Sequence, residues 1–276
     1  MSISHSTQEL NTVSPIDLKR LTGLIKIGEN FTREQAHELL KAGSKGKTIT
    51  DAQARRYITW GKTLHLIEES GTNFIRTTDG RLLAEKETGT AEWKKLFHQF
   101  LLRDSVYRRF YEILLQYPRF ERFETIERVG GWIGREAKVD NHVTPKILRN
   151  WAIELDILAK LPIKRRFILI DQELSLSQEE FWQKLVYVFK SLVHAEKQGF
   201  SVRIESVREE FANLWRMHPA YFDELLRQTA LSKEYTSILQ LSGGPARYVR
   251  ELKKKGYYPL TVNRKQYMYI AILGSE

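Results

Sequence analysis

The seven histidines are the residues best suited to metal binding or acid–base chemistry, because the 276-residue chain contains no cysteine. They are scattered along the sequence as His5, His37, His65, His98, His142, His194 and His218. None belongs to a His-Glu-x-x-His pair, the spacing that places two imidazoles on one helix face. Asp140 and His142 lie close together, but this short spacing is typical of a turn with a surface histidine. The sequence therefore predicts no metal site.

Two glycine-containing segments match parts of nucleotide-binding motifs. Gly46-Lys47-Thr48 matches the end of a phosphate-binding loop, but that loop needs a glycine where Lys41 stands, after a strand rather than a helix. The segment 241–244 (Leu-Ser-Gly-Gly) resembles the signature of ATP-binding cassettes, which works only against a complete phosphate loop. A loose nuclease-like set of carboxylates, Asp79 with Glu85, is better explained by a surface helix. We therefore predict no catalytic residue, no cofactor and no enzymatic activity.

Basic residues gather in three parts of the chain where helix or hairpin tips are expected, and they suit the phosphates of nucleic acid. The first group is Lys45, Lys47, Arg55 and Arg56, with Lys62 on the polar side of the same predicted helix. The second is Lys146, Arg149, Lys164, Arg165 and Arg166, and the third is Arg247, Arg250, Lys253, Lys254, Lys255, Arg264 and Lys265. Gln53, Arg56 and Thr59 lie on the polar side of one predicted helix, and Asn150 holds a similar place in another. These side chains are our candidates for contacts with base edges.

The composition agrees with a polyanionic partner. The formal net charge is +10 and the pI is about 9.6, an excess of basic residues that favours nucleic acid. The first 14 residues are polar and lack an apolar signal region, and the chain has no apolar run long enough to cross a bilayer. Together with the absence of cysteine, these features predict a cytoplasmic protein without a membrane partner.

Residues 32–85 are the segment with the clearest predicted order of elements. Thr32 and Gln35 have the spacing of a capping box, glycines near residues 43–46 end the helix, and Thr50 caps a longer one. A hairpin follows from Leu66 to Arg76, and we expect Thr78 to cap a closing helix. This order resembles the winged helix-turn-helix superfamily. The resemblance implies a small α+β fold whose second helix enters the DNA major groove, although winged helices also serve as protein-docking modules.

The same pattern returns later in the chain. A shift of 91 residues places Trp60 on Trp151, Leu64 on Leu155 and 66–67 on 157–158. A second hairpin is expected between residues 158 and 170, with Lys164–Arg166 at its tip. A third set of elements, a strand at 236–241 and a hairpin formed by 260–262 and 266–273, fits a winged helix more loosely. A repeated structural unit is therefore predicted.

We predict a helix-rich α+β protein of tandem winged-helix units. Its expected parts are a disordered tail (1–14), a first unit (15–88), a second with leading helices (89–171) and a third (172–276). The expected function is binding of double-stranded DNA, as a transcription regulator, a replication initiator or the DNA-recognising subunit of a defence or maintenance complex. The alternative is an interaction scaffold, like the tandem winged-helix subunits of condensin-like ATPases, with a protein partner or a second copy of the chain.

Overall fold

The computed structural model describes residues 17–42, 50–121, 144–163, 166–196, 201–245, 247, 249–250 and 258–273. Within these ranges the chain forms ten helices and four small antiparallel sheets, which confirms the predicted helix-rich α+β class. It divides into two compact units, Met1–Tyr117 with Arg122–Asp156, and Pro118–Glu121 with Ile157–Glu276. The division into a tail and three winged-helix domains stays a prediction.

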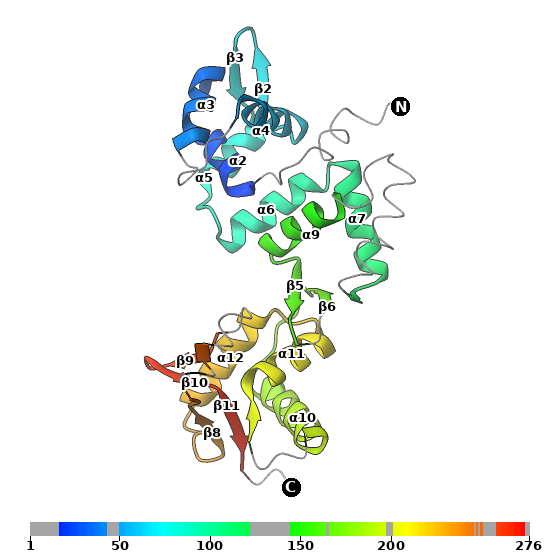
Figure 1. Cartoon of the computed structure of the whole chain (residues 1–276), viewed down its shortest axis with the longest axis vertical. Helices are drawn as coiled ribbons and strands as arrows, with labels where there is room; N and C mark the ends of the chain where they lie inside the picture. The colour runs from blue at the N-terminus through cyan, green and yellow to red at the C-terminus, as the bar shows by residue number, and fades with distance from the viewer. Residues whose placement is uncertain are drawn as a thin grey trace. The chain divides into compact units, whose positions relative to one another are not determined.

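The first three-stranded sheet lies in and just before residues 32–85, the segment with the clearest predicted order of elements (Figure 1). Its elements are α2 (Leu18–Ile25), β1 (Asn30–Thr32), α3 (Arg33–Ala42), α4 (Asp51–Thr63), β2 (Ile67–Ser70), β3 (Asn73–Arg76) and α5 (Thr78–Glu85). The hairpin β2–β3 is as expected, whereas β1 was not predicted; it pairs with β3, so that the last strand lies in the middle. Helix α5 is capped by Thr77 rather than Thr78, because the Thr77 hydroxyl accepts the Gly80 N–H at 3.1 Å.

Three further helices complete the described part of the first compact unit. They are α6 (Ala91–Leu101), α7 (Ser105–Gln116) and α9 (Thr144–Glu154). Trp60 of α4 and Trp151 of α9 are each 2 % exposed, and their rings meet edge to face with centroids 5.1 Å apart. The predicted burial of both tryptophans is therefore confirmed, and the two equivalent residues pack against each other.

The other two three-stranded sheets have the same strand order as the first. The second consists of β4 (Arg119–Glu121), β5 (Leu158–Leu161) and β6 (Arg166–Leu169); the third consists of β7 (Val202–Arg203), β8 (Leu239–Ser242) and β11 (Tyr269–Ile272). The orders are β4-β6-β5 and β7-β11-β8, against β1-β3-β2 in the first sheet. In each sheet the last strand in the sequence pairs with both others, which is the connectivity of a winged helix.

Hydrogen bonds show that the repeat extends to single residues. The residue after the central strand donates its N–H to the carbonyl just before the preceding strand in all three sheets. The three bonds are Thr77 to Leu66 (3.2 Å), Ile170 to Ile157 (2.9 Å) and Leu273 to Ile238 (2.9 Å). This agreement supports three copies of one winged-helix plan within the described residues.

The first two copies share two further features. The cross-strand pair Phe31–Phe74, with ring centroids 5.7 Å apart, has its counterpart in Phe120–Phe167 at 5.8 Å. After α4 and α9 the chain leaves the helix through His65 and Asp156, whose φ angles of 57° and 56° are both in the left-handed region. These two residues are separated by the same 91 positions as the two tryptophans.

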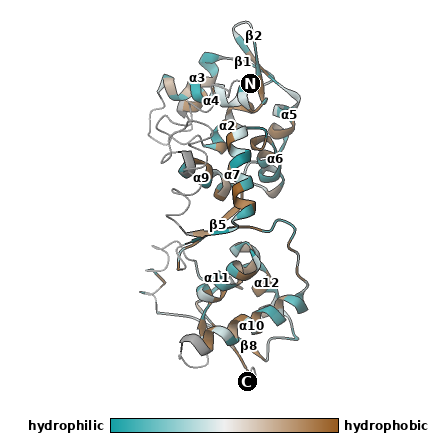
Figure 2. Cartoon of the chain, turned by 90° about the vertical axis from the view of Figure 1, so that its right-hand side faces the viewer, coloured by the Kyte–Doolittle hydropathy of each residue, from teal (hydrophilic) through white to brown (hydrophobic). Residues whose placement is uncertain are grey.

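The second compact unit has its main core between helices and the third sheet. Helices α10 (Gln178–Glu196), α11 (Ile204–Trp215) and α12 (Pro219–Leu231) surround a cluster that includes Phe181, Phe211 and Phe222. Figure 2 shows hydrophobic and hydrophilic residues together along α10, as expected for a helix with one buried face. A fourth sheet, the hairpin of β9 (Leu260–Val262) and β10 (Lys265–Tyr267), packs its first strand against α12.

The predicted last hairpin is wrong in one respect. The segment expected to be a single strand, 266–273, is divided at Met268 into β10 and β11. Strand β10 pairs with β9, whereas β11 pairs with β7 and β8 in another sheet. The division has a physical reason, because the Met268 N–H donates to the Ser242 carbonyl at 2.8 Å and its own carbonyl accepts from Ile204.

Half-buried His98 makes the stability of the first compact unit depend on pH. Its Nδ1 lies 3.0 Å from the hydroxyl of fully buried Tyr107, and burial lowers the His98 pKa from 6.5 to about 4. The folded protein therefore keeps His98 neutral while the unfolded chain takes up a proton below pH 6.5. We expect the free energy of unfolding, measured by urea titration, to fall as pH decreases from 6.5 to about 4.

The matched variant removes both partners of this contact. The double substitution His98→Leu with Tyr107→Phe removes the titrating group without leaving a buried hydroxyl unpaired. Its stability is expected to change less with pH across the same interval. An unchanged pH dependence in the double variant would assign the effect to other groups.

Candidate nucleic-acid interface

Helix α4 presents a polar face on the side away from its buried residues. The buried positions Ala54, Tyr57, Ile58 and Gly61 follow the spacing i, i+3, i+4, i+7. Arg55 and Thr59 lie on the opposite side of the helix, with Arg55 exposed and Thr59 half-buried. Within the described residues the Arg55 guanidinium has no ion-pair partner, and the Thr59 hydroxyl donates to the Arg55 carbonyl at 3.0 Å.

Other predicted contact residues of α4 are engaged within the protein. Gln53 forms a capping box with Thr50: its side-chain oxygen accepts the Thr50 N–H at 3.0 Å. Lys62 forms an ion pair with Glu69 of β2 at 2.7 Å, and Arg56 is half-buried. Among the predicted contact residues of this helix, Arg55 is thus the exposed cation that forms no ion pair within the described residues.

Helix α9 offers a similar pair of side chains. The shift of 91 residues places Lys146 on Arg55 and Asn150 on Thr59. Both Lys146 and Asn150 are exposed, whereas Arg149 is half-buried. A cation followed four residues later by a hydrogen-bonding side chain is therefore common to both helices, and this spacing places the two groups on one helix face.

The second hairpin packs against α11 within the second compact unit. Arg166 donates to the Asn213 side chain at 3.3 Å, and Arg119 of β4 donates to the Asn213 carbonyl at 2.7 Å. The Ile163 N–H donates to the side chain of Glu209, which is 2 % exposed, at 2.8 Å. Arg166, predicted to contact phosphates, thus has a partner inside the protein.

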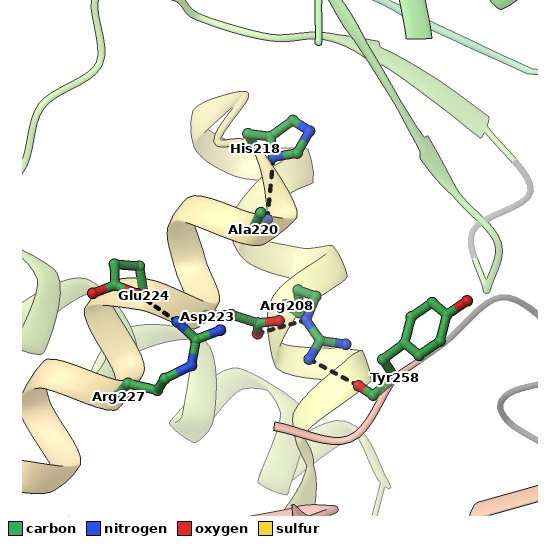
Figure 3. Close-up of polar contacts among 7 residues, drawn as sticks. All are labelled: Arg208, His218, Ala220, Asp223, Glu224, Arg227 and Tyr258. Carbon is green, nitrogen blue, oxygen red and sulfur yellow. Dashed lines mark hydrogen bonds and ion pairs between the residues drawn. The ribbon is translucent and has the colours of Figure 1, made fainter. Parts of the chain in front are cut away.

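Helix α12 has the position of α4 in the third copy, and its outer face differs in charge (Figure 3). Its buried residues Phe222, Leu225, Leu226 and Thr229 repeat the spacing seen in α4, and this alignment places Asp223 where α4 has Arg55. Asp223 accepts from Arg208 of α11 at 2.8 Å. Burial raises the pKa of the Asp223 carboxyl, and the neighbouring guanidinium opposes that rise.

The remaining predicted residues lie in the second compact unit or outside the described ranges. Arg247, Arg250, Arg264 and Lys265 are all exposed, and the last two lie on the β9–β10 hairpin. Lys45, Lys47, Lys164, Arg165, Lys253, Lys254 and Lys255 fall outside the described residues. The buried ion pair of Arg208 was not predicted, because a charged residue beside the apolar stripe of α11 has the sequence pattern of a solvated one.

No protein-family model matches the chain, and no curated protein matches it. Among solved structures, the chain is similar to restriction endonuclease FokI, with a TM-score of 0.41 and 10% identity over 77% of this chain and 59% of that one. It is also similar to FokI bound to DNA, with a TM-score of 0.37 and 11% identity over 98% and 57% of the two chains. No family is assigned. The chain spans less than two thirds of either FokI chain.

These comparisons correct one expectation. The matched structures are of an enzyme, which contradicts the prediction that this protein is not an enzyme. That prediction depended on incomplete motifs, and catalytic groups far apart in a sequence need not form a motif.

Within the described part of the chain, no group of three or more histidine, aspartate or glutamate residues has an arrangement that could hold a metal ion. The helices found there include none with the length and apolar character needed to cross a membrane.

Proposed function

We propose that the protein binds double-stranded DNA, with α4 and α9 as elements that contact it. The observation that supports this proposal is the shared outer face of the two helices, with Arg55 and Thr59 on one and Lys146 and Asn150 on the other. An arginine or lysine can donate to guanine edges or to phosphates, and asparagine can bond an adenine edge. The net charge of +10 supplies the long-range attraction to a polyanion.

Selection of preferred sites from random duplexes tests the proposal. We expect Arg55→Ala and Asn150→Ala each to relax the selected sequence and to weaken the best site by about 1–3 kcal/mol. Arg108, exposed on α7 and without an ion-pair partner among the described residues, provides the matched control. Arg108→Ala should leave the selected sequence unchanged.

Salt dependence provides a separate readout. Affinity for duplex DNA should fall steeply as salt rises, by about 0.9 log unit per log unit of salt for each neutralised phosphate. Failure of the wild-type protein to bind any duplex at about 50 mM salt would contradict the proposal. That result would favour the interaction scaffold instead.

A further inference from the structure

The third copy differs from the first two in the connection between its last two strands. Strands β2 and β3 are joined by two residues and β5 and β6 by four, whereas the connection from β8 to β11 spans residues 243–268. This long connection contains the β9–β10 hairpin. The third copy thus has an element that has no counterpart in the other two hairpin connections.

Arg208 holds the start of this hairpin beside α12. The side chain of Arg208 is 8% exposed, and its guanidinium donates both to Asp223 and to the Tyr258 carbonyl, the latter at 3.3 Å (Figure 3). Asp223 is the equivalent of Arg55, which faces outward in α4. The chain at Tyr258, which leads into β9, therefore lies next to this position in α12. The neighbouring Glu224 is paired with Arg227 on the same helix. The outer face of α12 is therefore acidic in part and internally paired.

The hairpin itself is anchored by its first strand and basic at its tip. Leu260 and Val262 are 1% and 7% exposed and belong to the core cluster. Asn263 and Arg264 form a two-residue turn with φ angles of 47° and 64°, the geometry of a type I′ turn. Arg264 and Lys265 are exposed, and neither forms an ion pair within the described ranges. The anchored strand β9 gives these two cations a fixed place on the surface.

We propose that, in the third copy, the β9–β10 hairpin contacts nucleic-acid phosphates in place of α12. The proposal rests on the proposed binding of DNA and adds to it that the three copies are not used in the same way. An acidic position paired with Arg208 does not attract a phosphate, whereas two exposed cations at a hairpin tip, without ion pairs among the described residues, do. Contacts to phosphates do not distinguish one base from another. The hairpin contact therefore adds affinity without sequence preference.

The test is a salt titration of duplex affinity with the full chain and a short labelled duplex of mixed sequence. The double variant Arg264→Ala with Lys265→Ala should reduce the slope of log affinity against log salt by about 0.9 for each lost contact. The swap Arg264→Lys with Lys265→Arg keeps both charges and should keep the slope. A second control, Lys95→Ala with Arg108→Ala, removes two exposed cations from α6 and α7 and should also keep it. Circular dichroism of each variant confirms folding.

The possible outcomes distinguish failure of the hairpin contact from failure of the proposed DNA binding. A wild-type slope in the Arg264→Ala, Lys265→Ala variant would overturn the hairpin contact while leaving DNA binding in place. A changed selected sequence in Arg227→Ala, at the α12 position equivalent to Thr59, would show that α12 contacts bases and would overturn the replacement. Absence of any duplex binding by the wild-type chain would refute the proposed function itself.

Discussion

Replacement of Trp60 by alanine is expected to lower the free energy of unfolding by about 3–5 kcal/mol. The indole is 2% exposed and meets the Trp151 ring edge to face, so truncation removes a large buried surface and leaves a cavity between α4 and α9. The measurement is urea unfolding followed by far-ultraviolet circular dichroism. A loss below about 1 kcal/mol would contradict the packing described for this pair.

A double-mutant cycle shows whether the two tryptophans act as a pair. Trp151→Ala alone is expected to cost a similar amount, because Trp151 is equally buried. The double variant should lose less than the sum of the single losses, since aromatic pairs contribute about 0.5–1.5 kcal/mol beyond their buried area. Strict additivity would mean that the two rings are stabilised by other neighbours.

Replacement of Arg208 by methionine is expected to destabilise the protein by about 3–5 kcal/mol, because it leaves Asp223 without its ion-pair partner. The Arg208 and Asp223 side chains are 8% and 20% exposed, so water compensates only in part. The matched control is Arg208→Met with Asp223→Leu, which removes both charges and should recover much of the loss. A double variant as unstable as the single one would assign the effect to lost packing or to the Tyr258 contact.

The pH dependence of this variant has a definite sign. Burial already raises the pKa of Asp223, and loss of the guanidinium raises it further. In the variant, the pKa of Asp223 in the folded state lies above its pKa in the unfolded chain, which is about 3.9. Below that pH the carboxyl is protonated in both states and does not lower the free energy of unfolding. The loss of stability appears as pH rises through the folded-state pKa. Arg208→Met should therefore approach the wild type in stability in acid and differ most near neutral pH.

The sequence predicted those elements that depend on local patterns. The capping box of Thr32 and Gln35 is confirmed, with bonds of 2.8 and 3.3 Å, because both partners lie within four residues. The hairpin β2–β3 and the burial of both tryptophans follow from alternation and spacing in the same way. The short strands β1, β4 and β7 were missed, since two or three residues are too few to show a period.

The candidate interface was predictable in composition but less so in geometry. Thr50 and Gln53 have the spacing of a capping box, so the sequence already contained the signal that Gln53 is engaged in the helix cap. The partners of Arg166 and Arg208 lie 47 and 15 residues away and were set by tertiary packing, which no local pattern reports. The exposure of Arg55, and its lack of an ion pair within the described residues, likewise depend on which carboxylates the fold brings near it.

The central place of the last strand in each three-stranded sheet has a consequence for synthesis on the ribosome. Strands β1 and β2 cannot join until β3 has emerged, and β7 and β8 wait for residues 269–272. A nascent chain that stops before Tyr269 would leave both β7 and β8 with unpaired backbone groups, which promote aggregation. The third sheet should thus not tolerate truncation into β11, whereas the first sheet can close while the remainder of the chain is still being made.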